Sequence, residues 1–183
     1  MNLHTPKPMS VEEFIGWSQN QPGQRFELIN GRPEPMSPEN LRHVVTKAAV
    51  WQALTRAAKS AQVKLQVLAD GMTVRIDDRT AYEPDAMIYT GDPLPGDTVV
   101  VPAPLVVVEV LSPGSRATDT GAKLKGYFKV ASIVHYLIID ADDKSVTHHR
   151  RTGAEVIETR VLREGVLVLD RPGLEVAISE FFT

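Results

Sequence analysis

The sequence predicts an α/β fold, and three features of its 183 residues carry that prediction. Residues 104–111, PLVVVEVL, form an almost unbroken β-branched run, which is typical of a strand buried on both faces of a sheet. Residues 104–140 then predict a strand, a helix and a second strand, the crossover unit of α/β folds. A long amphipathic helix is predicted after Pro38. Because no repeat or linker is visible, we expect residues 1–183 to form a single domain.

The N-terminal third predicts a short helix, a hairpin and the long helix. Ser10 is followed by Glu13 at capping-box spacing, which predicts a helix start. Residues 25–36 predict a β-hairpin, because Asn30-Gly31 suits the positive φ angles of a tight turn. The long helix carries apolar residues at helical spacing, and its expected buried face consists of Leu41, Val44, Val45, Ala48, Trp51 and Leu54.

The remaining chain predicts short strands around the crossover helix. Two strands are expected within residues 64–78 and a third at 85–89, followed by a proline- and glycine-rich surface connection or mobile flap at 90–104. Residues 117–130 predict a helix with Leu124, Tyr127 and Phe128 on one side, and 133–140 predict a buried strand. From Lys144 onward we expect short β segments and a final helical turn at 179–182.

Composition excludes several classes of site and location. The chain has no cysteine, so disulfides and thiolate chemistry are excluded, and any metal must bind oxygen or imidazole. No signal peptide or membrane-length apolar run is visible, which favours a cytoplasmic protein without membrane contact. The formal net charge of −3 disfavours strong nonspecific nucleic-acid binding. A local basic surface is still available from Arg25, Arg42, Lys47, Lys123, Lys125, Arg150 and Arg151.

Glu109 is the strongest chemical signal in the sequence. It lies inside the apolar strand between Val108 and Val110, and an ionised carboxylate is seldom buried without a partner or a metal. Pairing with a nearby Lys or Arg and metal binding are both open explanations. Asp85 follows Pro84 and opens a strand, and an acid in this position, taken by itself, is more often a turn-forming residue than a functional one. Two such carboxylates at the ends of neighbouring strands can hold a hard divalent cation such as Mg²⁺.

Together these segments resemble the Uma family of restriction endonucleases, within the PD-(D/E)xK nuclease superfamily. The resemblance covers nearly the whole chain and rests on the hairpin FELINGRPEPMSP, His43, EPDAMIY, PLVVVEVLSPGSR, the spacing of Asp119, Lys123 and Tyr127, and HYLIID. It implies a restriction-endonuclease-like central mixed β-sheet flanked by helices. An N-terminal helix and hairpin and C-terminal β segments are implied to accompany this sheet.

The resemblance also implies a catalytic set. Asp85 and Glu109 would bind Mg²⁺, or Mn²⁺, with help from a backbone carbonyl near Val110. The superfamily's usual lysine position, two residues after the Glu, is Leu111 here, and the resemblance places the lysine at Lys123. Asp119, Lys123 and Tyr127 share one helical stripe that can face the strand ends. The alternative for Lys123 is an exposed pair with Asp119 worth only ~0.3–0.5 kcal/mol, and Lys125 is the competing lysine.

Three further positions are auxiliary candidates. Glu27 matches a family acid that would complete the metal site or support it, although a solvated hairpin glutamate is an open alternative. His43 would contact phosphate or metal, unless it is simply hydrogen-bonded or solvent-facing. Tyr127 lies on the stripe of Lys123. His148-His149 and Arg150-Arg151 are interpreted as surface residues able to touch nucleic acid.

The expected function is metal-dependent endonucleolytic hydrolysis of DNA, with Asp85 and Glu109 holding Mg²⁺ and Lys123 assisting the attack of water. Because one site cuts one strand, symmetry implies a homodimer for duplex cleavage. The rival hypothesis is a nuclease-fold nucleic-acid-binding or regulatory protein that cleaves poorly or not at all, which the net charge and Leu111 favour. A structural protein with an ion-paired Glu109 is the third.

Overall fold

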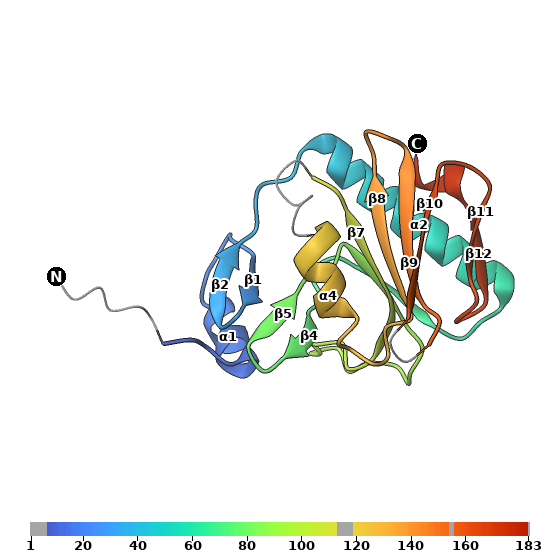
Figure 1. Ribbon diagram of the computed structural model, residues 1–183. Helices are drawn as coiled ribbons and strands as arrows, with labels where there is room; N and C mark the ends of the chain where they lie inside the picture. The colour runs from blue at the N-terminus through green and yellow to red at the C-terminus, as the bar shows by residue number, and fades with distance from the viewer. Residues whose placement is uncertain (1–6, 113–118, 154–155, 183) are drawn as a thin grey trace.

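The computed structural model describes residues 7–112, 119–153 and 156–182. Its centre is a six-stranded sheet in the order β10-β9-β8-β7-β6-β3 (Figure 1). The β7–β8 pair is parallel and the other neighbours in this sheet are antiparallel, so the predicted mixed sheet is confirmed. The strands of this sheet are β3 (Gln66–Ala69), β6 (Ala86–Tyr89), β7 (Pro104–Val110), β8 (His135–Asp140), β9 (Ser145–Arg151) and β10 (Ile157–Leu162).

The predicted crossover joins the two parallel strands. Between β7 and β8 the chain forms a π-helix, η1 (Asp119–Lys123), which continues into α4 (Leu124–Tyr127). In Figure 1, α4 lies in front of the sheet. This confirms a helix at 119–127 within the predicted 117–130, while positions 117 and 118 lie outside the described residues. Tyr127 is fully buried there in an apolar cluster with Val107 and Tyr136.

The opposite face of the sheet is covered by α2 (Leu41–Ala61), which runs behind it in Figure 1. The hairpin of β11 (Val166–Leu169) and β12 (Leu174–Ala177) extends this layer, followed by the 3₁₀-helix η2 (Ile178–Phe181). The expected final helical turn is therefore present, one residue earlier. Side chains of alternate strand residues pack here against the inner face of α2, which forms the larger core cluster.

The buried face of α2 is not the predicted one. Leu54 is buried as expected, but the other predicted residues are exposed, namely Leu41, Val44, Val45, Ala48 and Trp51. The helix instead packs through Val50, Ala53 and Ala58, whose small side chains let the helix approach the sheet closely. Lys47 is also on the buried side, where its ammonium group forms ion pairs with Glu39 and Asp70. Among the described residues, no helix combines the length and apolar character needed to span a membrane.

The N-terminal unit is a second, four-stranded sheet with one helix. Its order is β2-β1-β5-β4, and α1 packs beside it. The elements are α1 (Val11–Ser18), β1 (Phe26–Ile29), β2 (Arg32–Pro35), β4 (Val74–Asp77) and β5 (Thr80–Tyr82). Ser10 forms the predicted capping box with Glu13. Asn30 and Gly31 have φ angles of 52° and 80°, and a Cβ at Gly31 would lie 2.6 Å from the Cβ of Pro8, so glycine is required there.

The predicted surface connection at 90–104 is anchored near its end. The backbone N–H of Thr73 donates to the carbonyl of Val99 at 2.9 Å, and the N–H of Val101 donates to the carbonyl of Thr73 at 2.9 Å. Val101 is 2% exposed. This part of the segment is therefore part of the core and does not form a flap.

Candidate active site

Asp85 lies at the end of the sheet, where β6 begins beside the end of β7. Its backbone N–H donates to the carbonyl of Val108 at 2.9 Å, and its Oδ2 accepts the N–H of Val110 at 2.7 Å. Alternation along the strands puts Ala86 and Val108 in one core cluster and Met87 and Val107 in the other. Asp85 and Glu109 therefore share the sheet face covered by α4.

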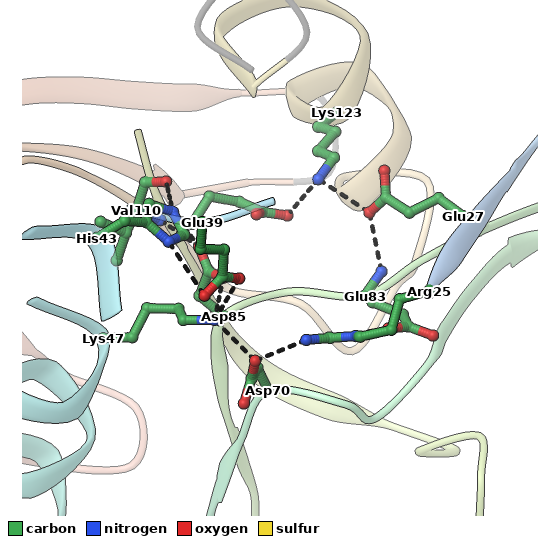
Figure 2. Close-up of polar contacts among 11 residues, drawn as sticks. Arg25, Glu27, Glu39, His43, Lys47, Asp70, Glu83, Asp85, Val110 and Lys123 are labelled. Carbon is green, nitrogen blue, oxygen red and sulfur yellow. Dashed lines mark hydrogen bonds and ion pairs between the residues drawn. The ribbon is translucent and has the colours of Figure 1, made fainter. Parts of the chain in front are cut away.

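Glu109 is compensated by a lysine and a phenol from the crossover helices. The Nζ of Lys123 donates to Glu109 Oε1 at 2.9 Å and lies 2.9 Å from Oε1 of Glu27, and the Tyr127 hydroxyl donates to Glu109 Oε1 at 2.5 Å. Glu109 and Lys123 are 4% and 5% exposed. Glu27 is fixed in turn because it accepts the backbone N–H of Glu83 at 3.0 Å (Figure 2).

Burial changes the protonation behaviour of two of these groups. Burial raises the pKa of Tyr127 well above its ordinary value, and the nearby Glu109 charge acts in the same direction, so Tyr127 remains a hydrogen-bond donor. Burial also raises the pKa of Asp85, although the Val110 N–H, His43 and Lys47 oppose it. A buried carboxylate of this kind gains stability from a bound cation.

A second group of side chains reaches Asp85 from the start of α2. Asn40 caps this helix by accepting the N–H of His43 at 3.0 Å. His43 Nε2 lies 2.8 Å from the carbonyl oxygen of Val110 and 3.7 Å from Asp85 Oδ2. Lys47 Nζ donates to Glu39 Oε1 at 2.6 Å and lies 3.6 Å from Asp85 Oδ1. Figure 2 shows these groups converging on Asp85 from one side.

The side chains of Glu39, His43 and Asp85 are arranged so that they could hold a metal ion. Each offers one ligand atom, and these three atoms lie within 4.8 Å of one another. The His43 side chain is 10% exposed, and its Nδ1 is a buried atom without a hydrogen-bond partner among the described residues. That nitrogen lies 3.6 Å from Glu39 Oε2. An imidazole flanked by two carboxylates, with one nitrogen free to donate to a carboxylate, is a donor set that divalent metal sites use.

An ion-pair chain supports this side of the site. Asp70 Oδ2 accepts from Lys47 Nζ at 2.7 Å and from Arg25 at 2.8 Å, and Arg25 also binds Glu83 at 2.9 Å. Figure 2 shows Lys47 and Arg25 approaching Asp70 from opposite sides. Burial alone would raise the pKa of Asp70, but the two cations outweigh it and lower that pKa. These ion pairs connect α2 to the N-terminal unit beside Asp85.

The structure thus brings the six candidate residues from the sequence into two adjoining groups, Glu27, Glu109, Lys123 and Tyr127 in one and His43 and Asp85 in the other. Val110, which follows Glu109, connects them through its backbone contacts with Asp85 and His43. Lys125 is exposed and stands apart from both groups. Sequence reasoning missed Glu39 and Asp70, and it placed Arg25 and Lys47 on a basic surface and not at this site. One signal was available, because Glu39, His43 and Lys47 recur at four-residue spacing, as Asp119, Lys123 and Tyr127 do.

The interpretation of the His148 region as surface is wrong. His148 and His149 are each 6% exposed, and the guanidinium of Arg151 donates to backbone carbonyls of Phe128 and Ile133. His148 instead pairs with buried His135, with 2.8 Å between the ring nitrogens. Two members of the expected basic surface, Lys47 and Lys123, are buried within the site and do not contribute to it.

Comparisons with known proteins identify the family of the chain and agree with its fold. The family model Uma2, described as putative restriction endonuclease, matches residues 11–180. The fold is similar to the crystal structure of a putative nuclease belonging to DUF820 from Anabaena variabilis, with a TM-score of 0.74 and 18% identity over 96% of this chain and 98% of that chain. Among curated proteins, no relative matches the sequence.

Proposed function

The chain belongs to the Uma2 family of putative restriction endonucleases, and from this premise we propose that it is a metal-dependent endonuclease that hydrolyses DNA phosphodiester bonds. One observation carries the proposal. Asp85 and Glu109 lie on one face at the end of the sheet, with Lys123 bound to Glu109 and His43 beside Asp85. A structural ion pair would need Lys123 alone, so it does not explain the second group around Asp85.

The donor set suits a divalent cation. We propose Asp85 and Glu109 as carboxylate ligands, joined by the carbonyl oxygen of Val110 and by His43 Nε2, which already face each other at 2.8 Å. Carboxylate and carbonyl oxygens suit Mg²⁺ and Mn²⁺, and an imidazole ligand adds affinity for Mn²⁺ in particular. When bound, the cation would stabilise negative charge on the reacting phosphate and acidify the attacking water.

His43 can serve this site by changing its tautomer. In the structure its Nε2 donates to the carbonyl oxygen of Val110, which leaves Nδ1 without a hydrogen-bond partner among the described residues. With the proton on Nδ1, the ring would donate to Glu39, 3.6 Å away, and Nε2 would present its lone pair to a cation. Metal-binding histidines commonly donate their other nitrogen to a carboxylate in this way.

Lys123 and Tyr127 prepare the other side of the site. The ammonium group of Lys123 lies 2.9 Å from a carboxylate oxygen of both Glu27 and Glu109, so it can donate a proton where phosphate and water would meet Glu109. Tyr127 fixes Glu109 Oε1, so the carboxylate is held in one orientation. We assign Lys123 the positioning of the attacking water or the neutralisation of charge on phosphate, and Glu27 the orientation of Lys123.

The experiment that tests the function is cleavage of supercoiled plasmid, linear duplex and single-stranded DNA with Mg²⁺ or Mn²⁺. We expect the wild-type chain to cut DNA, and Asp85→Asn and Glu109→Gln each to lose activity by on the order of 100-fold or more. Glu175→Gln is the matched control, since Glu175 is exposed on β12, and it should cleave like wild type. Cleavage that survives in EDTA or in both site variants would contradict the proposal.

The alternative is a nuclease-fold protein that binds nucleic acid without cutting it. The net charge of −3 and Leu111 at the usual lysine position favour this alternative. Lys123 weakens the second argument, because it supplies an ammonium group to Glu109 from another element. Binding of DNA by wild type, with no cleavage in either metal, would select the alternative.

For duplex DNA we also propose a symmetric homodimer, acting in the cytoplasm. One chain carries one Asp85–Glu109 pair, so two chains related by a two-fold axis are needed to cut both strands. Sedimentation equilibrium should show the dimer, and dilution below its dissociation constant should favour nicked over linear plasmid. A chain that is monomeric at all concentrations yet linearises plasmid in one step would exclude it.

A further inference from the structure

A pocket of about 420 Å³ opens beside the candidate active site. His43 is one of its walls, so the pocket adjoins the group that faces Asp85 and the Val110 carbonyl. The volume falls within the range of about 300–1,000 Å³ typical of small-ligand sites. None of the carboxylates assigned to metal binding lines it. The pocket is therefore next to the chemistry without being part of it.

The walls of the pocket divide into an apolar part and a charged part. Leu41, Leu111 and Ala141 supply the apolar part, and Leu41 is 79% exposed, although it begins a helix that buries other residues. Arg42 and Asp142 supply the charged part and form an ion pair across 100 positions of sequence. Both charged side chains are more than 60% exposed, so their pairing is weak and a ligand can open it.

This combination fits a planar heterocycle with hydrogen-bonding edges. The exposed Leu41 and the partly buried Leu111 offer an apolar surface for the face of a ring. A guanidinium beside a carboxylate offers donors and acceptors to its edge. An inorganic anion would use Arg42 but would be repelled by Asp142 and would leave the apolar wall uncovered. A purely apolar ligand would leave the charged pair without a role.

We propose that this pocket receives the base of a nucleotide adjacent to the scissile phosphate, with Arg42 and Asp142 reading its edge. The inference rests on the proposed nuclease function and specifies the substrate at the same site. His43 lines the pocket and also reaches Val110 and Asp85. A phosphate at Asp85 and Glu109 therefore places its neighbouring nucleotide within reach of Leu41 and Arg42.

Guanine satisfies this pair best. Its O6 and N7 accept from a guanidinium, which is the commonest specific arginine contact with a base, and its N1–H and N2–H₂ groups donate to a carboxylate. Adenine and cytosine match only part of this pattern, and thymine lacks the exocyclic amine. We therefore expect faster cleavage at sites with guanine at this position, by about tenfold over the other bases.

The first test measures binding and does not depend on cleavage. Wild-type protein with labelled Leu and Ala methyl groups is titrated with dGMP, dAMP, dCMP or dTMP and followed by NMR. We expect the methyl signals of Leu41 and Ala141 to shift, at the lowest concentrations for dGMP. Asp142→Asn and Arg42→Met should remove the preference for dGMP. Unshifted signals, or equal responses to all four nucleotides, would overturn the inference.

The second test measures cleavage of single-stranded DNA randomised around one cut site, because guanine N1–H is free to reach Asp142 only when the base is unpaired. In Arg42→Met and Asp142→Asn we expect the tenfold guanine preference to fall below about twofold while cutting continues. Arg56→Met is the matched control, because Arg56 is also an exposed α2 arginine in an ion pair, with Glu180 at 2.8 Å, and it lies outside the pocket. An unchanged base profile in both pocket variants would refute the pocket while leaving the nuclease proposal standing. If the wild-type protein does not cleave DNA at all, the nuclease proposal is refuted. The NMR titration alone would then decide whether the pocket binds a base.

Discussion

Lys123 and Lys125 lie two positions apart in opposite environments. Lys123 is 5% exposed and bound to Glu109 and Glu27, whereas Lys125 is exposed. Lys123 is the last residue of the π-helix η1, and its side chain points toward the sheet. Substitution of either lysine by methionine removes one ammonium group and keeps a stem of similar reach. The pair therefore isolates the contribution of that ammonium group.

We predict that Lys123→Met lowers metal-dependent cleavage by on the order of 100-fold or more, because the ammonium group bound to Glu109 is lost. Lys125→Met should stay within about twofold of wild type. Lys123→Met should also lower the melting temperature in EDTA, since two buried carboxylates lose their cation. Plasmid cleavage and circular dichroism measure the two effects. Equal activities in the two variants, or a larger loss in Lys125→Met, would reject the assignment of Lys123.

A buried histidine pair gives the protein a pH-dependent stability away from the site. Burial lowers the pKa of His135 and of His148 from 6.5 to about 4; Arg150 acts in the same direction on both rings and His148 does so on His135, while Asp170 opposes the shift. Both rings are therefore neutral in the folded chain and bind protons more readily when it unfolds. Their contribution to stability is complete above pH 6.5 and is lost as the pH falls toward 4.

We predict that the free energy of unfolding of wild type, measured with urea, falls between pH 7 and pH 4.5. The decrease is up to ~1.4 kcal/mol per pH unit for each ring. His148→Gln removes one titrating group, so its stability should fall less steeply over the same interval, even though its stability at pH 7 is lower. Parallel slopes for the two proteins would show that the pair does not titrate in this way.

Local chemistry explains which site residues could be predicted from the sequence. Glu109 was recognisable because a carboxylate inside an apolar strand demands a partner, and its partner Lys123 followed from the family resemblance. Asp70 and Arg25 were not recognisable, since each looks like an ordinary polar residue in a turn or at a strand start. Their importance comes from an ion-pair chain that joins segments 45 residues apart, and only the fold reveals it.

At the scale of elements, the close packing of α4 against Tyr82 of the N-terminal sheet depends on Gly126. A Cβ at Gly126 would lie 2.6 Å from Cε2 of Tyr82, so only glycine allows this approach. Tyr82 also lies beside Lys123, with 5.6 Å between the ammonium nitrogen and the ring centroid. The distance between Lys123 and Glu109 therefore depends on how closely α4 packs.

We predict that Gly126→Ala lowers cleavage by on the order of 10- to 100-fold, because an added methyl group displaces α4 and moves Lys123 away from Glu109. Gly121→Ala is the control within the same crossover, since nothing lies within 4 Å of its added Cβ. Both variants are compared by cleavage rate and by circular dichroism. Comparable activity in both would mean that the position of α4 does not set the rate.

Elements with strong local sequence signals were predicted closely, but the buried face of α2 was not. The capping box at Ser10 and the Asn30-Gly31 turn act over a few residues, so the sequence specifies them directly. Which face of α2 is buried depends on the side chains of the sheet that it packs against. Val50 and Ala53 pack in the core cluster, and Lys47 forms an ion pair with Asp70. Strand β5 was missed because three residues carry too little periodicity to be recognised.

At the scale of the whole molecule, one sheet connects the parts. The two larger apolar clusters lie on opposite faces of the same six strands, so neither can be lost without exposing the other. The N-terminal unit has a small cluster of its own but is tied on by Arg25 to Asp70 and by Lys123 to Glu27. We therefore propose that residues 1–183 unfold as one cooperative domain.

The last prediction concerns this unfolding in the presence of metal. Calorimetry in EDTA should give a single transition with equal calorimetric and van't Hoff enthalpies. Saturating Mn²⁺ should raise its midpoint, because a cation bound by Asp85, Glu109 and His43 links α2 to the sheet. At 100 times the dissociation constant the gain is ~2.7 kcal/mol, or roughly 5–10 °C for a chain of this size. Glu109→Gln should abolish most of the rise and Glu175→Gln should preserve it. Two separate transitions would disprove the single domain, and an equal rise in Glu109→Gln would remove Glu109 from the metal site, because a ligand stabilises only the state that binds it.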